Sequence, residues 1–310
     1  MRIFLTGATG FLGSAIVPEL INAGHEVLGL ARSDAGAAAL MAAGVTVHRG
    51  DVQDLESLRR GAAMSDGVIH TAFIHDFSKF NEICEIDRRA IEALGSALER
   101  SEHPLIVTSG TGMAAAPGRV GTEDDEPVPS SIGVPRSASE EAAASVGARG
   151  VRSTVVRLPQ VHDRVKHGLV SYLIAVAREK RVSAYVGDGQ NRWPAVHRLD
   201  AARLYKLALE RGSAGARYHA VDEEGVPARE IAEAIGRGLN VPVISISAEQ
   251  ASAHFGWLGM FIGRDMPASS ALTRLRLGWQ PTHTGIVDDL NHARDFALQP
   301  TYLPKARTLE

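Results

Sequence analysis

The chain of 310 residues contains a single cysteine and few aromatic residues, which make up 5% of it. A lone thiol, Cys84, excludes an intrachain disulfide, and its place in a helical pattern favours a small buried side chain over a nucleophile. No apolar run is long enough to span a bilayer, and no secretory signal precedes the first predicted strand. We therefore expect a cytoplasmic protein without a membrane partner.

An excess of charge of one sign is also missing. The formal net charge is -3, which gives no reason to expect nucleic acid as a partner. Spacings of histidine, cysteine and carboxylate residues that hold metal ions do not occur, so we predict no metal site. The Gly-x-Ser-x-Gly motif of serine hydrolases is absent as well, which argues against a nucleophilic serine.

The most informative segment is the first one, residues 1–33. Residues 2–6 form a short apolar run that predicts a buried strand, and the glycine-rich turn of residues 7–13 follows directly. Helical periodicity then continues to Gly24, and a second apolar run ends at Arg32 and Ser33. Strand, glycine turn, helix and strand in this order predict a βαβ unit whose turn binds the phosphates of a dinucleotide.

The spacing of the glycines suits such a turn. Gly7 permits the sharp exit from the strand, Gly10 lets a pyrophosphate approach the backbone, and Gly13 lets the helix pack closely on the sheet. Free N–H groups at the start of the helix, together with its dipole, attract phosphates. A glycine-rich turn without a ligand is the alternative, and the flanking strand and helix argue against it.

The end of the second predicted strand selects the cofactor. A carboxylate at this place would bind the ribose hydroxyls of NAD, whereas this chain has Arg32 and Ser33, a guanidinium and a hydroxyl suited to a 2′-phosphate. We therefore predict NADP(H) in preference to NAD(H). An exposed arginine partnered by Asp34 is the alternative. Asp51, after the third predicted strand, is expected either to meet the adenine amino group or to bond its own turn.

Strands and helices alternate along the first half of the chain. This alternation predicts an α/β Rossmann-type fold, in which a doubly wound parallel sheet carries helices on both faces. We assign residues 1–160 to an NADP-binding domain and residues 161–310 mainly to a smaller C-terminal α/β cap lobe for the substrate, with some elements returning to the sheet. The irregular stretch 113–135 is expected to be a lid or binding loop, with disorder as the alternative.

Several motifs together resemble the extended short-chain dehydrogenases/reductases, also grouped as NAD-dependent epimerase/dehydratases. They are spread over nearly the whole chain: Thr6 to Gly13, Gly50-Asp51-Val52, His70-Thr71-Ala72, Arg157-Leu158-Pro159, Val196-His197-Arg198-Leu199-Asp200 and Leu277-Gly278-Trp279-Gln280-Pro281. The resemblance implies a Rossmann-type sheet and a substrate-binding C-terminal lobe. It also implies cofactor contacts from Gly7, Thr9, Gly10, Phe11, Leu12, Arg32, Ser33, Asp51, Val52, Thr71, Ala72, Phe73 and Pro159.

The resemblance fails at the catalytic pair. The family has Tyr-x-x-x-Lys at the start of the helix after the long loop, where the tyrosine transfers the proton and the lysine lowers its pKa. In this chain Val134 and Ala138 stand at these two positions, and no tyrosine occurs before Tyr172. The chain therefore resembles an atypical, 3β-hydroxysteroid dehydrogenase-like member that has lost the usual proton donor.

Other residues have to replace the missing acid. Ser109 and Thr111 flank the place of the family's serine or threonine and are candidate donors toward the substrate oxygen. His75, after the fourth predicted strand, and His162, after the sixth, are candidate catalytic histidines because imidazole exchanges a proton near neutral pH. Twelve histidines make a structural role a strong alternative for each. Lys79 is a candidate for the missing positive charge.

These patterns predict an NADP(H)-dependent oxidoreductase that reduces a carbonyl or oxidises a secondary alcohol of a small molecule by hydride transfer. Two alternatives stay open: an epimerase or dehydratase that retains its cofactor, and a non-catalytic sensor of the NADP(H) ratio, which the loss of the pair would favour. Trp193 is expected either to stack on a substrate ring or to pack in the core. The helix predicted over residues 81–100 is expected to pack in a homodimer, as the resemblance implies.

Overall fold

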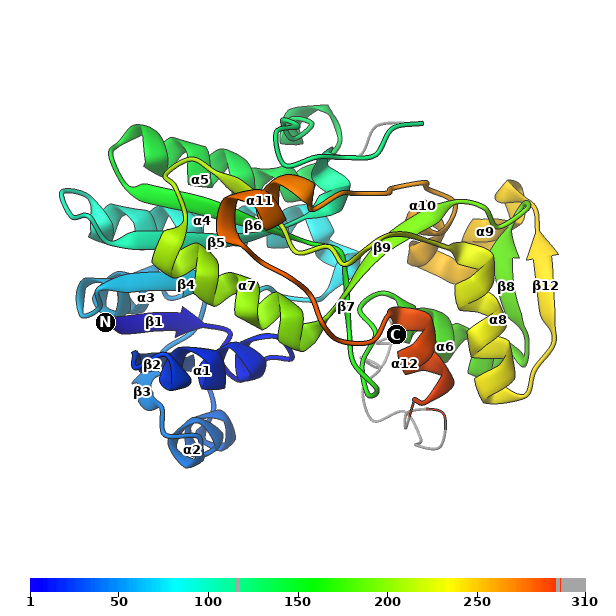
Figure 1. Ribbon diagram of the computed structural model, residues 1–310, viewed down its shortest axis with the longest axis horizontal. Helices are drawn as coiled ribbons and strands as arrows, with labels where there is room; N and C mark the ends of the chain where they lie inside the picture. Colours follow the sequence, from blue (N-terminus) through cyan, green and yellow to red (C-terminus); the bar gives the residue numbers. More distant parts are fainter. Residues whose placement is uncertain (115–117, 294–295, 297–310) are drawn as a thin grey trace, which may run out of the picture.

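The computed structural model describes residues 1–114, 118–293 and 296, and it has a larger N-terminal part and a smaller C-terminal part (Figure 1). A seven-stranded sheet with only parallel neighbours forms the centre of the larger part. Across the sheet the strands follow the order β10 (Arg217–His219), β6 (Arg152–Leu158), β5 (Pro104–Gly110), β4 (Gly67–His70), β1 (Arg2–Thr6), β2 (Glu26–Ala31) and β3 (Thr46–Arg49). This order confirms the predicted Rossmann-type fold.

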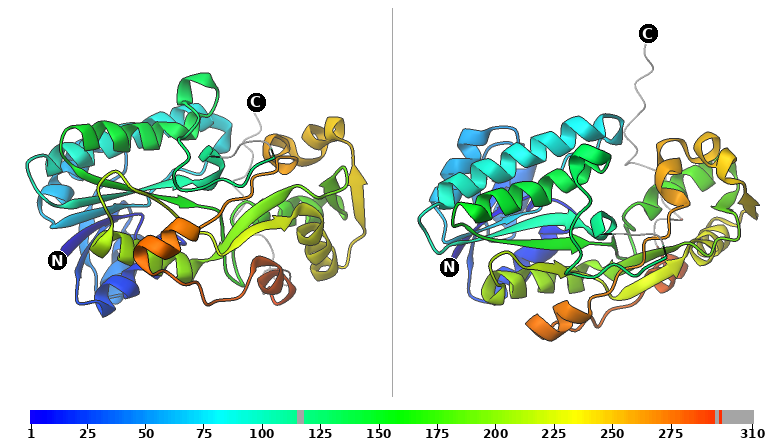
Figure 2. Two further views of the ribbon diagram at one scale, coloured as in Figure 1. Left: turned by 45° about the horizontal axis from the view of Figure 1, so that its top comes forward. Right: turned by 90° about the horizontal axis from the view of Figure 1, so that it is seen from above.

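Helices cover both faces of this sheet (Figure 2). One face carries α3 (Leu55–Ala63), α4 (Phe80–Leu98) and α5 (Ala138–Ala148). The other face carries α1 (Gly13–Asn22), α2 (Asp34–Ala42) and α7 (Arg198–Arg211). The last of these follows the cap segments in the chain, so the chain returns from the smaller part to complete the larger one.

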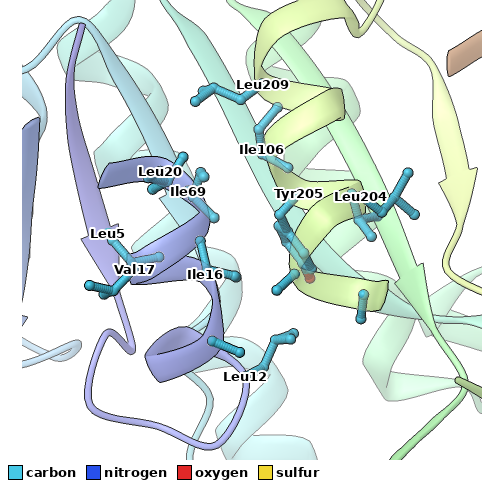
Figure 3. Packing of buried hydrophobic residues seen from close by; sticks show 14 of the residues in the cluster. Leu5, Leu12, Ile16, Val17, Leu20, Ile69, Ile106, Leu204, Tyr205 and Leu209 are labelled. Carbon is cyan, nitrogen blue, oxygen red and sulfur yellow. The ribbon is translucent and has the colours of Figure 1, made fainter. Parts of the chain in front are cut away.

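The strands are apolar on both faces, as parallel strands between two helical layers must be. Along β1, Ile3 and Leu5 point into the core under α1 and α7, while Phe4 points into the core under α3 and α4, and all three are 0% exposed. Figure 3 shows Leu5 with Ile16 of α1 and Tyr205 of α7. The period of two along the strand thus builds two cores, and it directs the carboxyl ends of the strands to one edge.

The smaller part contains a three-stranded mixed sheet and a two-stranded parallel sheet. Its strands are β7 (Gln160–His162), β9 (Arg192–His197) and β11 (Glu223–Pro227) in the first, and β8 (Ser183–Val186) and β12 (Val243–Ile246) in the second. Its helices are α6 (Val170–Lys180), α8 (Ala228–Leu239), α9 (Ala248–Phe255), α10 (Gly259–Ile262) and α12 (Ile286–Asn291). Apart from β7, whose Val161 lies in the core of the larger part, these elements share a core of their own around Trp193.

Short 3-10 turns and one further helix complete the described chain. The helix is α11 (Ala271–Leu277), which lies against α7 and β10, and the turns are η1 (Phe77–Lys79), η2 (Thr111–Ala114), η3 (Ser130–Ile132), η4 (Pro135–Ser137) and η5 (Gly256–Leu258). The stretch 113–135 that was expected to be irregular holds η3 and parts of η2 and η4, and residues 115–117 of it lie outside the described residues. Among the described helices, none has both the length and the apolar character needed to cross a membrane.

Candidate cofactor and active site

The glycine turn between β1 and α1 is tightly closed. Gly7 has a φ of +73°, and its carbonyl accepts the N–H of Gly10 at 2.8 Å. A Cβ on Gly13 would lie 2.0 Å from that same carbonyl oxygen, so only glycine fits there. No side chain of the described residues caps the N-terminus of α1. The start of α1, with the positive end of its dipole, therefore stays open to an anion, which fits the phosphates of a dinucleotide.

Arg32 and Ser33 lie at the end of β2, beside the N-terminus of α2. The Ser33 hydroxyl accepts a backbone N–H and caps α2, whereas the Arg32 side chain is 80% exposed and lies 4.0 Å from the carboxylate of Asp51. Arg49 of β3 donates to the carbonyl of Ser33 at 2.6 Å and pairs with Asp34. Two guanidinium groups thus flank this helix end. Asp51 also bonds a backbone N–H of its own turn at 3.0 Å.

The end of β4 is joined to the end of β1. Thr71 donates both its backbone N–H and its hydroxyl to the carbonyl of Thr6, and the N–H of Ala72 reaches the Thr6 hydroxyl at 3.3 Å. Val52, Ala72 and Phe73 line a small hollow beside these strand ends. Four residues that the resemblance assigns to the cofactor therefore lie together at the carboxyl edge of the sheet, next to the glycine turn.

Behind this edge lies a chain of buried polar groups. The Thr6 hydroxyl lies 2.7 Å from Nδ1 of His70, whose Nε2 lies 3.0 Å from the carboxylate of Asp87. The other carboxylate oxygen accepts a hydrogen bond from Arg136 at 2.7 Å and one from the Ser139 hydroxyl. Desolvation acts to raise the pKa of Asp87, but the charge of Arg136 and these hydrogen bonds hold it well below its usual value. Asp87 is therefore ionised.

Arg136 brings a positive charge to the edge between β4 and β5. Its guanidinium also donates to the carbonyl of Thr108 at 2.9 Å and lies 4.3 Å from the centre of the Phe73 ring. Its side chain is 13% exposed. Sequence reasoning missed both Arg136 and Asp87. Asp87 could have been noticed in the sequence, because its carboxylate lies between Ile83 and Ile91 on the buried face of the predicted helix.

The two candidate hydroxyl groups after β5 have different surroundings. Ser109 is buried, and its hydroxyl donates to the carboxylate of Glu140 at 2.7 Å. Glu140 in turn accepts a hydrogen bond from Arg157, which is 0% exposed, at 2.8 Å. The Ser109 hydroxyl thus joins β5 to α5. Thr111, at the start of η2, is also buried.

His75 is exposed in the loop between β4 and η1. Its ring lies edge-on to Phe73 at 5.5 Å and to Phe77 at 6.2 Å. Surrounding protein atoms lower the pKa of His75, a hydrogen bond to the backbone of Phe73 opposes this effect, and the positive charges of Arg136 and Lys166 lower the pKa further. These effects together favour the neutral form of the imidazole.

An aromatic group joins this loop to the cap. Phe77 stacks on Trp257 of η5 with ring centres 4.3 Å apart and an interplanar angle of 8°. Tyr172 of α6 lies edge-on to both rings. His75 therefore lies between the carboxyl edge of the sheet and the smaller part of the molecule. The sequence offered no spacing that predicts this group, because its three members lie in distant segments.

His162 has a different environment. It is 0% exposed on β7, its Nδ1 lies 2.8 Å from the carboxylate of Asp289, and its ring lies edge-on to His197 at 5.8 Å. Pro159 joins β6 to this strand. This placement, tied to α12 by a buried carboxylate, supports a structural role for His162.

Two further cations lie beside the glycine turn. Lys166 and Arg198 lie over the ring of Phe11, 5.8 Å and 5.0 Å from its centre. Thr9 and Gly10 of the same turn are exposed, whereas Leu12 belongs to the core. The ring of Phe11 thus brings two positive charges to the glycine turn.

The other residues singled out from the sequence have the following surroundings. Trp193 is 1% exposed in the core of the smaller part, which is the packing alternative. Cys84 is buried, and desolvation raises the pKa of its thiol to about 11. Lys79 is exposed at the end of η1. Val134 directly precedes η4 and Ala138 begins α5, so neither supplies a proton.

This arrangement of glycine turn, parallel sheet and cap is that of a dinucleotide-dependent enzyme. The sequence profile of the NAD dependent epimerase/dehydratase family matches residues 3–222, and the chain belongs to this family. Its activity is accordingly NAD(P)-dependent oxidoreduction or epimerisation of the kind that this family carries out, and its cofactor class is a nicotinamide dinucleotide.

Particular relatives support the same family. An uncharacterized protein of Schizosaccharomyces pombe is 52% identical over 292 residues, which cover 94% of this chain and 98% of the relative. The decarboxylating sterol-4-alpha-carboxylate 3-dehydrogenase of Dictyostelium discoideum is 27% identical over 243 residues, 74% of either chain. The crystal structure of DesIV, a dTDP-glucose 4,6-dehydratase from Streptomyces venezuelae with NAD and TYD bound, has a TM-score of 0.76 at 19% identity, covering 96% of both chains, and shares the fold.

Proposed function

We propose that this protein is an NADP(H)-dependent oxidoreductase that reduces a carbonyl group, or oxidises a secondary alcohol, of a small molecule. The observation that carries the proposal is the position of His75. It is an exposed, neutral imidazole at the carboxyl edge of the sheet, beside the cation of Arg136, and the loop that holds it contacts the cap. An imidazole in such a place exchanges a proton with a substrate oxygen.

The preference for NADP(H) rests on the end of β2. Arg32 is exposed, and the loose 4.0 Å pairing with Asp51 leaves its guanidinium able to reach a phosphate group. Arg49 adds a second positive charge beside the α2 N-terminus, where the helix dipole also favours an anion. A 2′-phosphate fits these groups, whereas the two carboxylates nearby, Asp51 and Asp34, lie beside Arg32 and Arg49.

Each residue has a separate task in this proposal. When bound, the nicotinamide ring supplies or accepts the hydride. The glycine turn and Thr71 hold the cofactor in place, and Arg136 contributes a fixed positive charge at the edge of the sheet. His75 takes the proton from the alcohol oxygen or returns it to the carbonyl oxygen. Thr111 is the candidate hydrogen-bond donor to that oxygen, because the hydroxyl of Ser109 already donates to the carboxylate of Glu140.

The substrate is proposed to be a small hydroxy or oxo compound bound between sheet and cap. The sterol dehydrogenase relative supports this chemistry and the 3β-hydroxysteroid dehydrogenase-like assignment. The family description supports a second candidate, an epimerase or dehydratase that returns the hydride to its own product. The loss of the tyrosine at Val134 and the lysine at Ala138 supports a third, a non-catalytic sensor of the NADP(H) ratio. A homodimer formed through α4 and α5 is likewise a proposal.

The proposal is tested by following NADPH consumption with a panel of ketones, aldehydes and steroids. We expect at least one carbonyl compound to consume NADPH. We expect His75→Gln to lower kcat by roughly a hundredfold, as removal of a general acid or base does, while the Kd for NADPH stays near that of the unmodified protein. His292→Gln, a change at an exposed histidine of α12's C-terminal end, is the matched control and should leave kcat unaltered.

Two results would overturn parts of this account. If His75→Gln retains full activity on a substrate that the unmodified protein reduces, His75 is not the group that transfers the proton. Tight binding of NADPH and NADP with no consumption across the panel would instead favour the sensor or the cofactor-retaining epimerase.

A further inference from the structure

Arg136 occupies the segment from which the family's catalytic pair is missing. It lies on η4, between Val134 and Ala138. These are the positions at which the resemblance places the family's tyrosine and lysine. Its guanidinium reaches the carboxyl edge of the sheet, where it is held by Asp87 at 2.7 Å and by the carbonyl of Thr108 at 2.9 Å. This segment thus carries a positive charge, although Ala138 stands at the position of the family's lysine.

The charge of Arg136 is fixed in place as well as in sign. Asp87, its partner, is 3% exposed and is itself held by His70 and Ser139. An arginine in a protein stays protonated at every pH at which the protein is folded. Asp87, His70 and Ser139 therefore hold the permanent positive charge of Arg136 in one position.

Phe73 connects this cation to His75. The guanidinium lies over one side of the Phe73 ring, 4.3 Å from its centre, and the imidazole of His75 lies edge-on to the same ring at 5.5 Å. A neutral imidazole carries a proton on one ring nitrogen and a lone pair on the other, so the ring of His75 can accept a proton.

We propose that a histidine–arginine pair replaces the tyrosine–lysine pair in this protein, with Arg136 as the positioning residue that supplies a fixed positive charge on the far side of the Phe73 ring from His75. The catalytic meaning of the pair rests on the proposed oxidoreductase function. The free ring nitrogen of His75 takes the proton from the alcohol oxygen as the C=O bond forms, and gives it back in the reduction direction. The hydride lost or gained by the carbon is balanced by the nicotinamide cofactor.

Other charged groups also act on His75. Lys166, from the turn after β7, acts in the same direction as Arg136. Asp76 and Lys79 belong to the same loop as His75 and carry opposite charges. Asp87 lies behind Arg136 and partly offsets its charge. The proposal therefore predicts opposite effects for the removal of Arg136 and for the removal of its counter-charge alone.

The test is a titration of the His75 ring by NMR in the free protein, with the resonance assigned by its loss in His75→Gln. Arg136→Lys keeps the charge and should leave the pKa of His75 near that of the unmodified protein. The double variant Asp87→Asn/Arg136→Met removes the cation without leaving a buried carboxylate, and it should raise the pKa by about 0.5 to 1 unit. Asp87→Asn alone keeps the cation and should lower the pKa.

Arg88→Met is the matched control, because Arg88 lies one residue after Asp87 on α4 and pairs with Glu85 and Glu141. It should not move the titration of His75. An unchanged titration in both Asp87→Asn and the double variant would overturn the proposal. If the double variant does not fold, the downward shift in Asp87→Asn still decides the matter.

The titration of His75 and the NADPH consumption assay test the Arg136 proposal and the proposed function separately. If the pKa of His75 depends on Arg136 but no carbonyl compound consumes NADPH, the interaction between Arg136 and His75 is supported and the oxidoreductase function is rejected. If NADPH is consumed but the pKa of His75 does not depend on Arg136, the oxidoreductase function is supported and the role of Arg136 is rejected. With a substrate in hand, the double variant should shift the pH profile of kcat/KM in the direction of the titration, while KM changes little and Arg136→Lys restores the profile.

Discussion

The guanidinium of Arg136 lies 2.7 Å from the carboxylate of Asp87, and the two side chains are 13% and 3% exposed. The pair joins η4 to α4 across 49 residues of sequence. Breaking a buried pair leaves one charge uncompensated in a medium where water cannot solvate it, whereas replacing both partners removes that cost.

We therefore predict that Arg136→Met alone destabilises the protein by about 3 to 5 kcal/mol. The double variant Asp87→Asn/Arg136→Met should recover most of this loss. Urea unfolding of the two single variants, the double variant and the unmodified protein measures the coupling. If the losses of unfolding free energy in the two single variants simply add up in the double variant, Asp87 and Arg136 do not stabilise each other, which would contradict the prediction.

The glycine turn makes a steric prediction. A Cβ at Gly13 would lie 2.0 Å from the Gly7 oxygen, so Gly13→Ala must shift the turn against α1. We expect NADPH affinity to fall by roughly a hundredfold, since the N–H groups that would bind the phosphates are displaced. Titration calorimetry measures the affinity. Gly147→Ala in α5 is the control, because its Cβ would have no neighbour nearer than 3.9 Å and alanine is the better helix former. Weakened binding in Gly147→Ala would point to a general loss of stability.

Cofactor choice depends on Arg32 in this account. Arg32→Ala should raise the Kd for NADPH at least tenfold, or roughly 1.4 kcal/mol, and leave the Kd for NADH nearly unchanged, because only NADPH carries the 2′-phosphate. Calorimetric titrations with both cofactors at low salt measure the ratio. Arg60→Ala, an exposed arginine on α3, should change neither affinity. Equal losses for both cofactors in Arg32→Ala would contradict the assignment.

His167 predicts a pH-dependent stability. It is 0% exposed, and neither ring nitrogen has a hydrogen-bond partner among the described residues. Desolvation and the charge of His162 outweigh the opposing charges of Asp289 and Asp163 and lower its pKa to about 4. The unfolded chain therefore binds more protons than the folded protein between pH 6.5 and pH 4. Stability is full above this window and falls as the pH drops through it, by about 3 kcal/mol.

His167→Leu should remove this component and flatten the decline. Thermal melts at a series of pH values measure it, and His292→Leu at an exposed position is the control that should keep the decline. Some decline should persist in His167→Leu, since burial and the charge of Arg157 lower the pKa of His219 to about 4 as well. A decline of unaltered size in His167→Leu would contradict the prediction.

Local sequence patterns predicted the fold and the glycine turn. Apolar runs such as residues 2–6 carry the period of buried strands, and Gly7, Gly10 and Gly13 restrict the turn to one geometry through sterics alone. The regular alternation with helices predicted a parallel sheet covered on both faces, and the structure adds the order of its strands.

Contacts between distant segments could not be predicted in the same way. The hydroxyl of Ser109 is taken up by Glu140, which lies 31 residues later, and nothing in the Thr-Ser-Gly segment indicates this. Arg136 stands in an ordinary Pro-Arg-Ser sequence, and its role depends on Asp87, which the helical pattern hides among apolar neighbours. Such pairings depend on tertiary packing, which residue spacing does not encode.

The most direct test of the central claim uses NADPH in which both hydrogens at C4 are replaced by deuterium, incubated with the protein and the panel of carbonyl compounds. Mass spectrometry then locates the label. The account predicts an alcohol that carries deuterium on the former carbonyl carbon, and much less of it with His75→Gln. An alcohol without label, or label that stays entirely in the cofactor although the cofactor binds, would contradict the claim that this protein transfers hydride to a carbonyl substrate.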